Sequence, residues 1–387
     1  MKLYLSDKGA YRVRRGHPWV FSRELESSRQ DREIPGGSAV HLYDRNEDYL
    51  AFAHYESQSK VACRVLSRQR EPDEKELLER RILAAFALRS RVIPPSNSGC
   101  RLIHGEGDML PGLIADSFGD YLLLELHSQG MVQRRKTLAK VFDEHLAPKG
   151  MILKTFDSQG SFELEILKDP PPSPLQISLD GLQLLVDLQG GRKKGHFYDQ
   201  GSNRKKFTPL LSGYKVLDTF CYNGAWGLSA AYHGALEIEF LDHSKENLQL
   251  IEASAELNGV MERCSFVEDD VLSFLKGRAK GSAKYDAIIL DPPALASSIE
   301  SKEEGMKEYL RLSRESMACL HPGGFLISSS CSRFLTMEEF TAIINKAASQ
   351  RGRFAKIVGQ GSLSPDHPLP SGLPEANYLK CLLLEVD

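Results

Sequence analysis

The sequence has no segment typical of a membrane-spanning or exported protein. Its apolar runs are all shorter than the roughly 18 residues that a membrane-crossing helix needs. The N-terminal residues read MKLYLSDKGAYRVRRG, and no apolar stretch follows these charges, so a signal peptide is not expected. These absences predict a cytoplasmic protein with no membrane partner.

Cysteine pairs at redox or metal-binding spacing are also missing. The seven cysteines are scattered along the chain, at Cys63, Cys100, Cys221, Cys264, Cys319, Cys331 and Cys381. An odd number of widely spaced thiols indicates reduced cysteines rather than a disulfide framework. Since no two cysteines are close enough to chelate from one turn, we expect no zinc or iron–sulfur site and no metal.

The chain has no excess of positive charge. Its net charge is -3 and its pI is near 6.4, which argues against a uniformly basic nucleic-acid-binding protein. Four short basic runs stand out, at Arg12/Arg14/Arg15, Arg134/Arg135/Lys136, Arg192/Lys193/Lys194 and Arg204/Lys205/Lys206. One such run is usually a solvated face, but four on a slightly acidic chain indicate segregated charge.

The 387 residues are too many for one ordinary core, and their patterns predict three domains. Residues 1–72 contain short strand patterns between turn signals, typical of a small β-barrel. Residues 73–185 combine strands with helices at 73–91 and 130–147, which predicts a central α+β domain. Residues 186–387 alternate apolar strands and helices. They predict an α/β, Rossmann-like domain whose mostly parallel sheet is covered on both faces.

A ligand turn follows the first strand of the third domain. Val216–Asp218 leads into Thr219–Gly227, whose glycines fit neither GxGxxG nor a P-loop. Gly224 and Gly227 let a ligand approach the backbone, and ligands of such sheets bind beyond the strand ends. We expect a nucleoside with an amino-acid tail rather than a pyrophosphate. The candidate contacts here are Asp218, Phe220, Tyr222, Asn223 and Gly224.

Acidic residues end the next two strands. Asp242 lies about 24 residues after Asp218, where a carboxylate accepts hydrogen bonds from both ribose hydroxyls. Asp269 and Asp270 follow the third strand, where a carboxylate can accept from an adenine amino group. Each acid alone is equally well explained as a helix cap or turn residue. Acids at three successive strand ends, with the glycine turn, favour S-adenosylmethionine as the cofactor.

The fourth strand is followed by Asp291, Pro292, Pro293 and Ala294. Two prolines fix the backbone there, so the carboxylate is held rigidly and can orient a substrate ring. Enzymes that methylate exocyclic amines have an aromatic residue after the prolines. Ala294 at this place argues against amine methylation.

A cysteine follows the fifth strand, at Cys331 among serines. If the fourth and fifth strands are neighbours, Cys331 and Asp291 face one another. A thiolate that attacks C6 of a pyrimidine makes C5 able to accept a methyl group, and Asp291 could supply the proton that cytosine needs near N3. The alternative is that Cys331 is a small buried apolar residue. Cys221, in the glycine turn, is expected to pack under the cofactor.

A basic segment with interleaved aromatic residues, Gly190–Lys206, precedes the first strand of the sheet. It contains His196, Phe197 and Tyr198, and it could hold the methionine end of the cofactor and touch phosphates. The alternative is an ordinary solvated loop.

The chain resembles the bacterial 23S ribosomal RNA cytosine-C5 methyltransferases that carry an N-terminal PUA domain. The resemblance covers nearly the whole length, in these segments: Arg14–Ser22, Asp108–Leu113, Phe118–Gly119, Lys193–Gln200, Val216–Gly224, Asp291–Pro293, Ser330–Ser332, Asp366–Pro368 and Tyr378–Lys380. It implies a class I methyltransferase fold, a PUA-like domain that helps to hold RNA, and Cys331 as nucleophile. It also adds Tyr198, Asp199 and Gln200 to the cofactor-binding residues.

The predicted partner is ribosomal RNA, and a second copy of the chain is a further candidate. A target base in a paired stem would have to be flipped or presented on a single strand. Two other functions stay open. One is methylation of guanine or adenine with Cys331 structural, and the other is a non-catalytic RNA-binding assembly factor.

Overall fold

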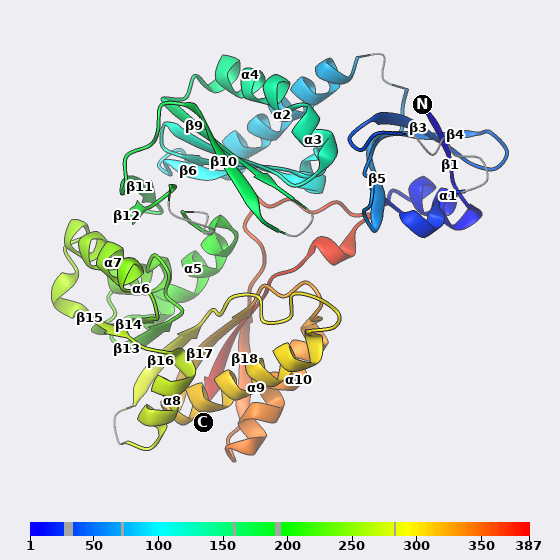
Figure 1. Ribbon diagram of the computed structural model, residues 1–387. Coiled ribbons are helices and arrows are strands. Elements are labelled where there is room, and N and C mark those ends of the chain that lie inside the picture. Colours follow the sequence, from blue (N-terminus) through cyan, green and yellow to red (C-terminus); the bar gives the residue numbers. More distant parts are fainter. Residues whose placement is uncertain (27–33, 71–72, 158–159, 190–194, 282–283) are drawn as a thin grey trace. The chain divides into compact units, whose positions relative to one another are not determined.

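The chain crosses three times between two structural units (Figure 1). The computed structural model describes residues 1–26, 34–70, 73–157, 160–189, 195–281 and 284–387. Unit 1 consists of Met1–Pro172 and Pro365–Ala376, and unit 2 of Ser173–Ser364 and Asn377–Asp387. This division differs from three domains bounded at 72 and 185. Those boundaries stay a prediction. The hairpin that residues 175–186 form belongs to unit 2, although the prediction assigned residues up to 185 to the central domain.

The N-terminal part of unit 1 is a five-stranded sheet with one helix. Its strands are β1 (Lys2–Tyr4), β2 (Trp19–Phe21), β3 (Ala39–Tyr43), β4 (Tyr49–Tyr55) and β5 (Val61–Ser67), in the order β1-β3-β4-β5-β2. Strand alternation buries one face of the sheet, including Val40, Leu42 and Ala51. Helix α1 (Asp7–Arg14) packs Ala10 and Val13 into the same core. The sequence patterns do not predict α1 or β2.

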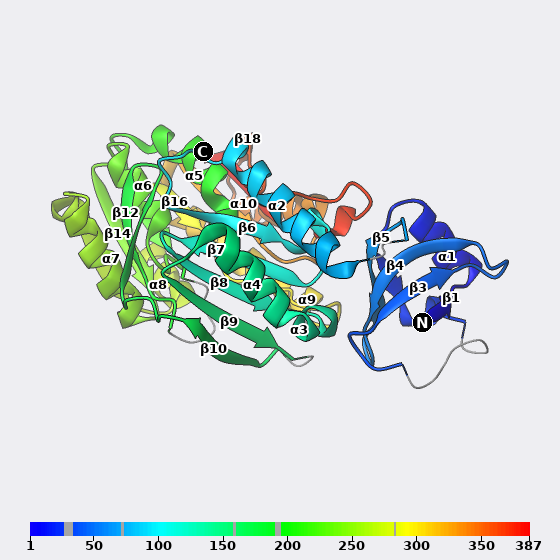
Figure 2. The same cartoon turned by 90° about the horizontal axis from the view of Figure 1, so that it is seen from above.

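The central part of unit 1 is a second five-stranded sheet. Its strands are β6 (Gly99–His104), β7 (Leu113–Phe118), β8 (Tyr121–Leu126), β9 (Gly150–Phe156) and β10 (Phe162–Lys168), in the order β10-β9-β8-β7-β6. Helices α2 (Glu74–Val92) and α4 (Arg135–Leu146) lie along this sheet (Figure 2) and bury Leu78, Ile82, Leu138 and Phe142 against it. The predicted helix 130–147 is divided, because α3 (Gln129–Gln133) ends before α4 begins.

A segment from near the C-terminus, Pro365–Ala376, completes unit 1. Two buried arginines hold it: Arg89 Nη2 donates to Asp366 O (2.8 Å), and the backbone N–H of Arg101 donates to Asp366 Oδ2 (3.0 Å). The segment passes so close to Gly107 that a Cβ there would lie 1.9 Å from Pro368 O. Glycine at 107 is therefore required by this packing.

Unit 2 is built on a seven-stranded sheet. Its strands are β13 (Lys215–Thr219), β14 (Glu237–Asp242), β15 (Cys264–Glu268), β16 (Tyr285–Leu290), β17 (Leu320–Ser330), β18 (Ala355–Gln360) and β19 (Lys380–Val386). The order is β15-β14-β13-β16-β17-β19-β18, and β19 is antiparallel to both neighbours. A separate hairpin, β11 (Leu175–Leu179) with β12 (Leu182–Val186), packs against helices of this unit.

Helices cover both faces of this sheet (Figure 1). One layer consists of α8 (Val271–Ala279), α9 (Lys302–Ala318) and α10 (Met337–Gln350), and the other of α5 (Gly201–Phe207), α6 (Ala225–Tyr232) and α7 (Lys245–Leu257). The prediction of an α/β, Rossmann-like sheet covered on both sides is confirmed. In the described ranges, no helix has both the length and the apolar character needed to cross a membrane.

The core of unit 2 supports a direct stability test. Phe340 of α10 is fully buried, and its ring meets Tyr309 edge-on with centroids 5.8 Å apart. We expect Phe340→Ala to lower the free energy of unfolding by about 3–5 kcal/mol, because the cavity cannot fully collapse. Urea unfolding followed by circular dichroism measures this. Phe354→Ala, at a ring that is 60% exposed, should change it by no more than about 0.5 kcal/mol. Equal losses in the two variants would contradict this packing.

Candidate active site

The first element of the site is the buried carboxyl group of Asp218, at the end of β13. Its Oδ2 accepts from Gly227 N (2.8 Å), and its Oδ1 has no hydrogen-bond partner among the described residues. A Cβ at position 227 would lie 2.9 Å from this carboxylate and 2.3 Å from the ring of Phe240, so glycine is needed there. Burial, with the nearby Asp291 and Asp242, raises the pKa of Asp218 to about 8.

The turn after Asp218 has an unusual backbone. Phe220 and Tyr222 have φ angles of 55° and 53°, and Gly224 has 72°. Left-handed backbone is unfavourable for residues other than glycine and is concentrated in ligand-binding turns. The turn is therefore held in one shape by its surroundings, with the N-terminus of α6 behind it.

Asp242, at the end of β14, is oriented by three N–H donors. Its Oδ2 accepts from Tyr222 N (3.0 Å), and its Oδ1 accepts from Ser244 N (2.9 Å) and Asn247 Nδ2 (3.2 Å). The carboxylate is 4% exposed. It is thus fixed beside the glycine turn, as expected for a group that accepts from a ligand.

The two acids after β15 differ from each other. Asp270 is the N-cap of α8, because its Oδ1 accepts from Ser273 N (2.9 Å). Asp269 is exposed at the strand end, and its Oδ1 accepts from Asp270 N (2.7 Å). The capping explanation left open for these acids therefore holds for Asp270, and Asp269 is the better placed of the two for a ligand.

The segment before β13 is tied to the glycine turn through His196, which is buried. Its Nε2 accepts from Arg204 Nη2 (2.9 Å), and its Nδ1 lies 2.9 Å from Asn223 Nδ2. Burial and the adjacent guanidinium hold the pKa of His196 well below its usual range, so the ring is neutral. Asn223 is therefore positioned in the turn by residues of α5 and the segment before it.

Asp291 lies between two donors that the sequence analysis did not identify as partners. Gln200 Nε2 donates to its Oδ1 (3.1 Å), and Trp226 Nε1 donates to its Oδ2 (3.1 Å). Burial, followed by the charge of Asp199, raises the pKa of Asp291 to about 6. Asp199 itself accepts from the hydroxyl of Tyr378 (2.8 Å). Two residues of the predicted segment Tyr198–Gln200, Asp199 and Gln200, thus act on Asp291.

Cys331 is half-buried at the end of β17, and β16 is the adjacent strand. Its Sγ lies 4.0 Å from Pro292 O, so the thiol is beside the Asp291–Pro293 turn as the strand order predicts. Burial, with the charges of Asp291 and Asp199, raises the pKa of Cys331 to about 12. Cys221, in contrast, is buried in the turn, and burial holds its pKa far above the usual range.

Hydroxyl groups hold the loop around Cys331. Ser330 Oγ donates to Tyr309 Oη (2.9 Å), which lies 2.9 Å from Ser332 Oγ. Ser332 Oγ also accepts from Ala296 N (3.0 Å), in the loop after the two prolines. The serines beside Cys331 therefore fix the cysteine loop to the Asp291 loop.

Many residues of the basic runs form ion pairs with acidic residues of the same chain. Arg12 pairs with Glu24 (3.1 Å), Arg14 with Asp44 (2.5 Å), Arg134 with Glu74 (2.7 Å) and Lys205 with Asp180 (3.0 Å). Arg135 and Lys136 are exposed on α4. Arg192, Lys193 and Lys194 lie outside the described residues.

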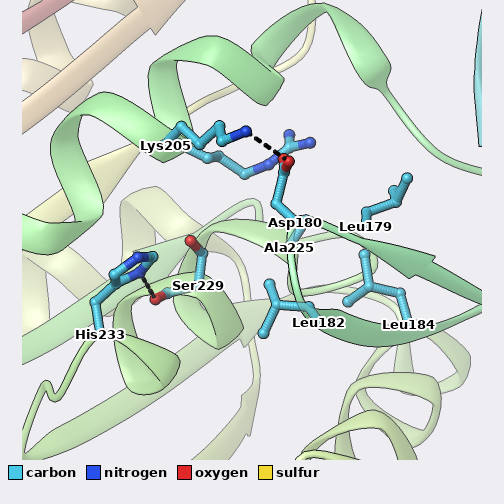
Figure 3. Close-up of a pocket in the computed structure, with 9 residues that line it drawn as sticks. Leu179, Asp180, Leu182, Leu184, Lys205, Ala225, Ser229 and His233 are labelled. Carbon is cyan, nitrogen blue, oxygen red and sulfur yellow. Dashed lines mark hydrogen bonds and ion pairs between the residues drawn. The ribbon is translucent and has the colours of Figure 1, made fainter. Parts of the chain in front are cut away.

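A small cavity of about 80 Å³ lies elsewhere in unit 2 (Figure 3). Its lining comes from β11, β12, α5 and α6, and consists of Leu179, Asp180, Leu182, Leu184, Arg204, Lys205, Ala225, Ser229 and His233. Arg204 and Lys205 belong to the predicted segment Gly190–Lys206, but the predicted acids, the glycine-turn contacts and Cys331 do not line this cavity. No group of three or more His, Cys, Asp or Glu residues in the described part of the chain is arranged to hold a metal ion.

The comparisons with known proteins cover nearly the whole chain. Residues 3–68 match the model of a PUA-like domain, and residues 101–350 match that of an S-adenosylmethionine-dependent methyltransferase. The chain is 32% identical over 379 residues to a ribosomal RNA large subunit methyltransferase I from Vibrio cholerae, which covers 95% of each chain. It is 31% identical over 396 residues to the protein of that name from Serratia proteamaculans, covering 98% of each.

Solved structures share the fold. SMU.776, a methyltransferase complexed with SAH, superposes with a TM-score of 0.88 at 23% identity, covering 100% of both chains. An S-adenosylmethionine-dependent methyltransferase from Streptococcus mutans gives 0.86 at 22%, also over 100% of both chains.

The buried carboxyl groups predict a pH-dependent stability. Asp218 has an ordinary pKa of 3.8 and a folded pKa of about 8, so the folded chain keeps a proton that the unfolded chain releases. This contribution to stability is complete below about pH 4 and is lost as the pH rises to about 8. Asp218→Asn should remove up to about 1.4 kcal/mol per pH unit of that slope, measured by urea unfolding of the ligand-free protein. Parallel profiles for the two proteins would show that Asp218 is already ionised.

Proposed function

Because the chain belongs to the S-adenosylmethionine-dependent methyltransferases, and within them to the ribosomal RNA large subunit methyltransferase I family, we propose that it methylates C5 of a cytosine in 23S ribosomal RNA through a covalent adduct on Cys331. One observation carries this proposal: a half-buried thiol and a rigidly held carboxyl group lie at adjacent strand ends, with Cys331 Sγ 4.0 Å from Pro292 O. This is the pairing that attack on a pyrimidine ring requires.

Cys331 acts as the nucleophile in this proposal. Its thiolate attacks C6 of the cytosine, a C6–S bond forms, and C5 gains the electron density needed to accept a methyl group. S-adenosylmethionine supplies that electrophilic methyl group when it is bound. A general base then takes the C5 proton. The electrons of the broken C5–H bond restore the C5–C6 double bond as the C6–S bond breaks and the Cys331 thiolate leaves.

Asp291 holds the proton that the ring needs near N3. A pKa of about 6 leaves part of the carboxyl population protonated near neutral pH, which suits a general acid. The N–H groups of Trp226 and Gln200 keep the carboxyl group in one orientation. Proton transfer therefore starts from a fixed atom rather than a mobile side chain.

The carboxyl groups of the site fit a nucleoside with a cationic tail. Asp218 Oδ1 is buried and accepts no hydrogen bond from the residues that the structure describes. It suits the methionine ammonium group, which would favour the ionised form of Asp218. Asp242 is oriented to accept from the ribose hydroxyls. Asp269, at the end of β15, suits the adenine amino group. Phe220, Tyr222, Asn223 and Gly224 shape the turn, and Tyr198, Asp199 and Gln200 would hold the methionine end.

RNA binding is assigned to the PUA-like domain and to the exposed cations. Arg15, at the C-terminal end of α1, and Tyr11 form an exposed cation–aromatic pair. The guanidinium of Arg15 donates to the hydroxyl of Tyr11 (2.7 Å). Arg135 and Lys136 offer further charge on α4. Cations and aromatic rings together suit phosphates and unstacked bases. A second copy of the chain as partner and a cytoplasmic location stay predictions.

Covalent chemistry at Cys331 is tested by supplying variants of this protein to cells that lack it. We expect Cys331→Ala to leave the 23S RNA site unmethylated, because alanine has no thiol that could form the adduct. Mass mapping of the RNA measures this. Cys264→Ala, at the other partly exposed cysteine, should restore methylation.

A trapping experiment separates pyrimidine chemistry from its alternatives. RNA containing 5-fluorocytidine should form a stable adduct with the wild-type protein and none with Cys331→Ala, because fluorine at C5 blocks elimination. Methylation restored by Cys331→Ala would exclude the covalent mechanism and favour a purine target.

Cofactor recognition by Asp242 is tested by titration calorimetry with S-adenosylhomocysteine. We expect Asp242→Asn to weaken binding roughly 10- to 100-fold, because an oriented charged acceptor is lost. Asp286→Asn is the matched control, since this carboxylate accepts from Lys215 N (2.9 Å) at the opposite end of the same sheet. Equal affinities for wild type and Asp242→Asn would remove Asp242 from the cofactor site.

A further inference from the structure

A buried lysine lies directly beside the cysteine loop. Lys380 begins β19 and is the register partner of Ser330, the residue before Cys331. It is 3% exposed, and its Nζ donates to Ser332 O (2.6 Å) and Tyr378 O (2.7 Å). The amino group is therefore held against the peptide that follows the nucleophile.

The two carbonyl groups orient the ammonium group but do not neutralise it. A buried charge is costly unless an opposite charge is near. Two acidic groups favour the charged form of Lys380, namely Cys331 and Glu339, while burial lowers its pKa to about 8. Glu339 already accepts from Lys302 Nζ (2.6 Å) and from the N–H of Thr336, at the start of α10. Cys331 is therefore the partner whose charge changes during the reaction.

Apart from Lys380, the surroundings of Cys331 disfavour the ionised form of its thiol. Burial disfavours its negative charge most, and the charges of Asp291 and Asp199 add to this effect. The phenol of Tyr309 lies nearby but is bonded to Ser330 and Ser332. Among the described side chains that act on the thiol, Lys380 favours the thiolate.

We propose that Lys380 is a positioning residue whose fixed ammonium group stabilises the thiolate of Cys331. This role rests on the proposed function, in which Cys331 is the nucleophile. The lysine acts through the thiol, and its hydrogen bonds to Ser332 O and Tyr378 O keep the charge in place. A cation so held lowers the cost of forming the thiolate without taking part in bond changes.

The test measures how readily Cys331 ionises in the full-length protein, without RNA or cofactor. Iodoacetamide reacts with thiolates, and peptide mass spectrometry gives the alkylation rate of each cysteine from pH 6 to 10. Lys380→Gln keeps an N–H donor for the carbonyl groups but removes the charge. We expect it to slow alkylation of Cys331 about tenfold at pH 6–7, and the difference to fade as the pH rises to 10, because Lys380 itself then loses its proton. Lys380→Arg, which restores the charge, should stay within about threefold of wild type at pH 6–7.

Cys264 is the internal control, since it is partly exposed on β15 and lies on another strand. Its alkylation should be the same in all variants, which also shows that each variant is folded. If Lys380→Gln does not fold, we compare Lys380→Arg with Lys380→Met instead, provided that the alkylation rate of Cys264 is equal in the two variants. A Cys331 profile that does not move when the charge is removed overturns the proposal.

This result is independent of the adduct experiment. A wild-type protein that forms no adduct with 5-fluorocytidine RNA contradicts the proposed function, even if its alkylation profile shifts as expected. An adduct in wild type with an unshifted profile in Lys380→Gln contradicts the role of the lysine alone.

Discussion

The site depends on keeping several carboxyl groups buried at one edge of one sheet. Asp218, Asp242 and Asp291 end adjacent parallel strands, and Asp199 lies beside them. Their charges oppose one another, so each needs N–H or O–H donors to stay in place. The glycine turn, Trp226, Gln200 and Tyr378 supply those donors. A cluster of carboxyl groups of this kind suits a cationic ligand, and S-adenosylmethionine carries both a sulfonium and an ammonium group.

The same edge explains which parts of the fold were predictable. Parallel strands place their carboxyl ends together, so acids and a cysteine that follow apolar runs could be assigned to one site without coordinates. The helices of the outer layers were harder to recognise. Helix α9, for example, is rich in charged residues and buries Gly305, Ser313, Glu315 and Ser316 as well as apolar residues, so few apolar positions mark it in the sequence. Strand β18 is mostly exposed, and its pattern has no alternation.

Contacts between distant segments could not be predicted from one sequence. Arg134 and Arg204 stand in basic runs, yet the structure uses them to hold Glu74 and His196. Nothing in the local sequence shows that Glu74, 60 residues away, is the partner of Arg134. Trp226 stands in the turn Thr219–Gly227, but nothing in the local sequence shows that its indole N–H donates to Asp291, 65 residues later. The role of a basic run is therefore clear only after its partners are known.

The C-terminal segment shows why the methyltransferase core alone is not the whole site. The family match ends at residue 350, but Ser364 and Tyr378 both bind Asp199, and Lys380 follows two residues later. Between them, Pro365–Ala376 leaves unit 2 and is fixed in unit 1 through Asp366. One stretch of chain therefore carries an anchor in unit 1 and residues that contact Asp199 and the cysteine loop. A truncation after α10 would remove the lysine and the tyrosine together, so the catalytic unit is not defined by its sheet motifs alone.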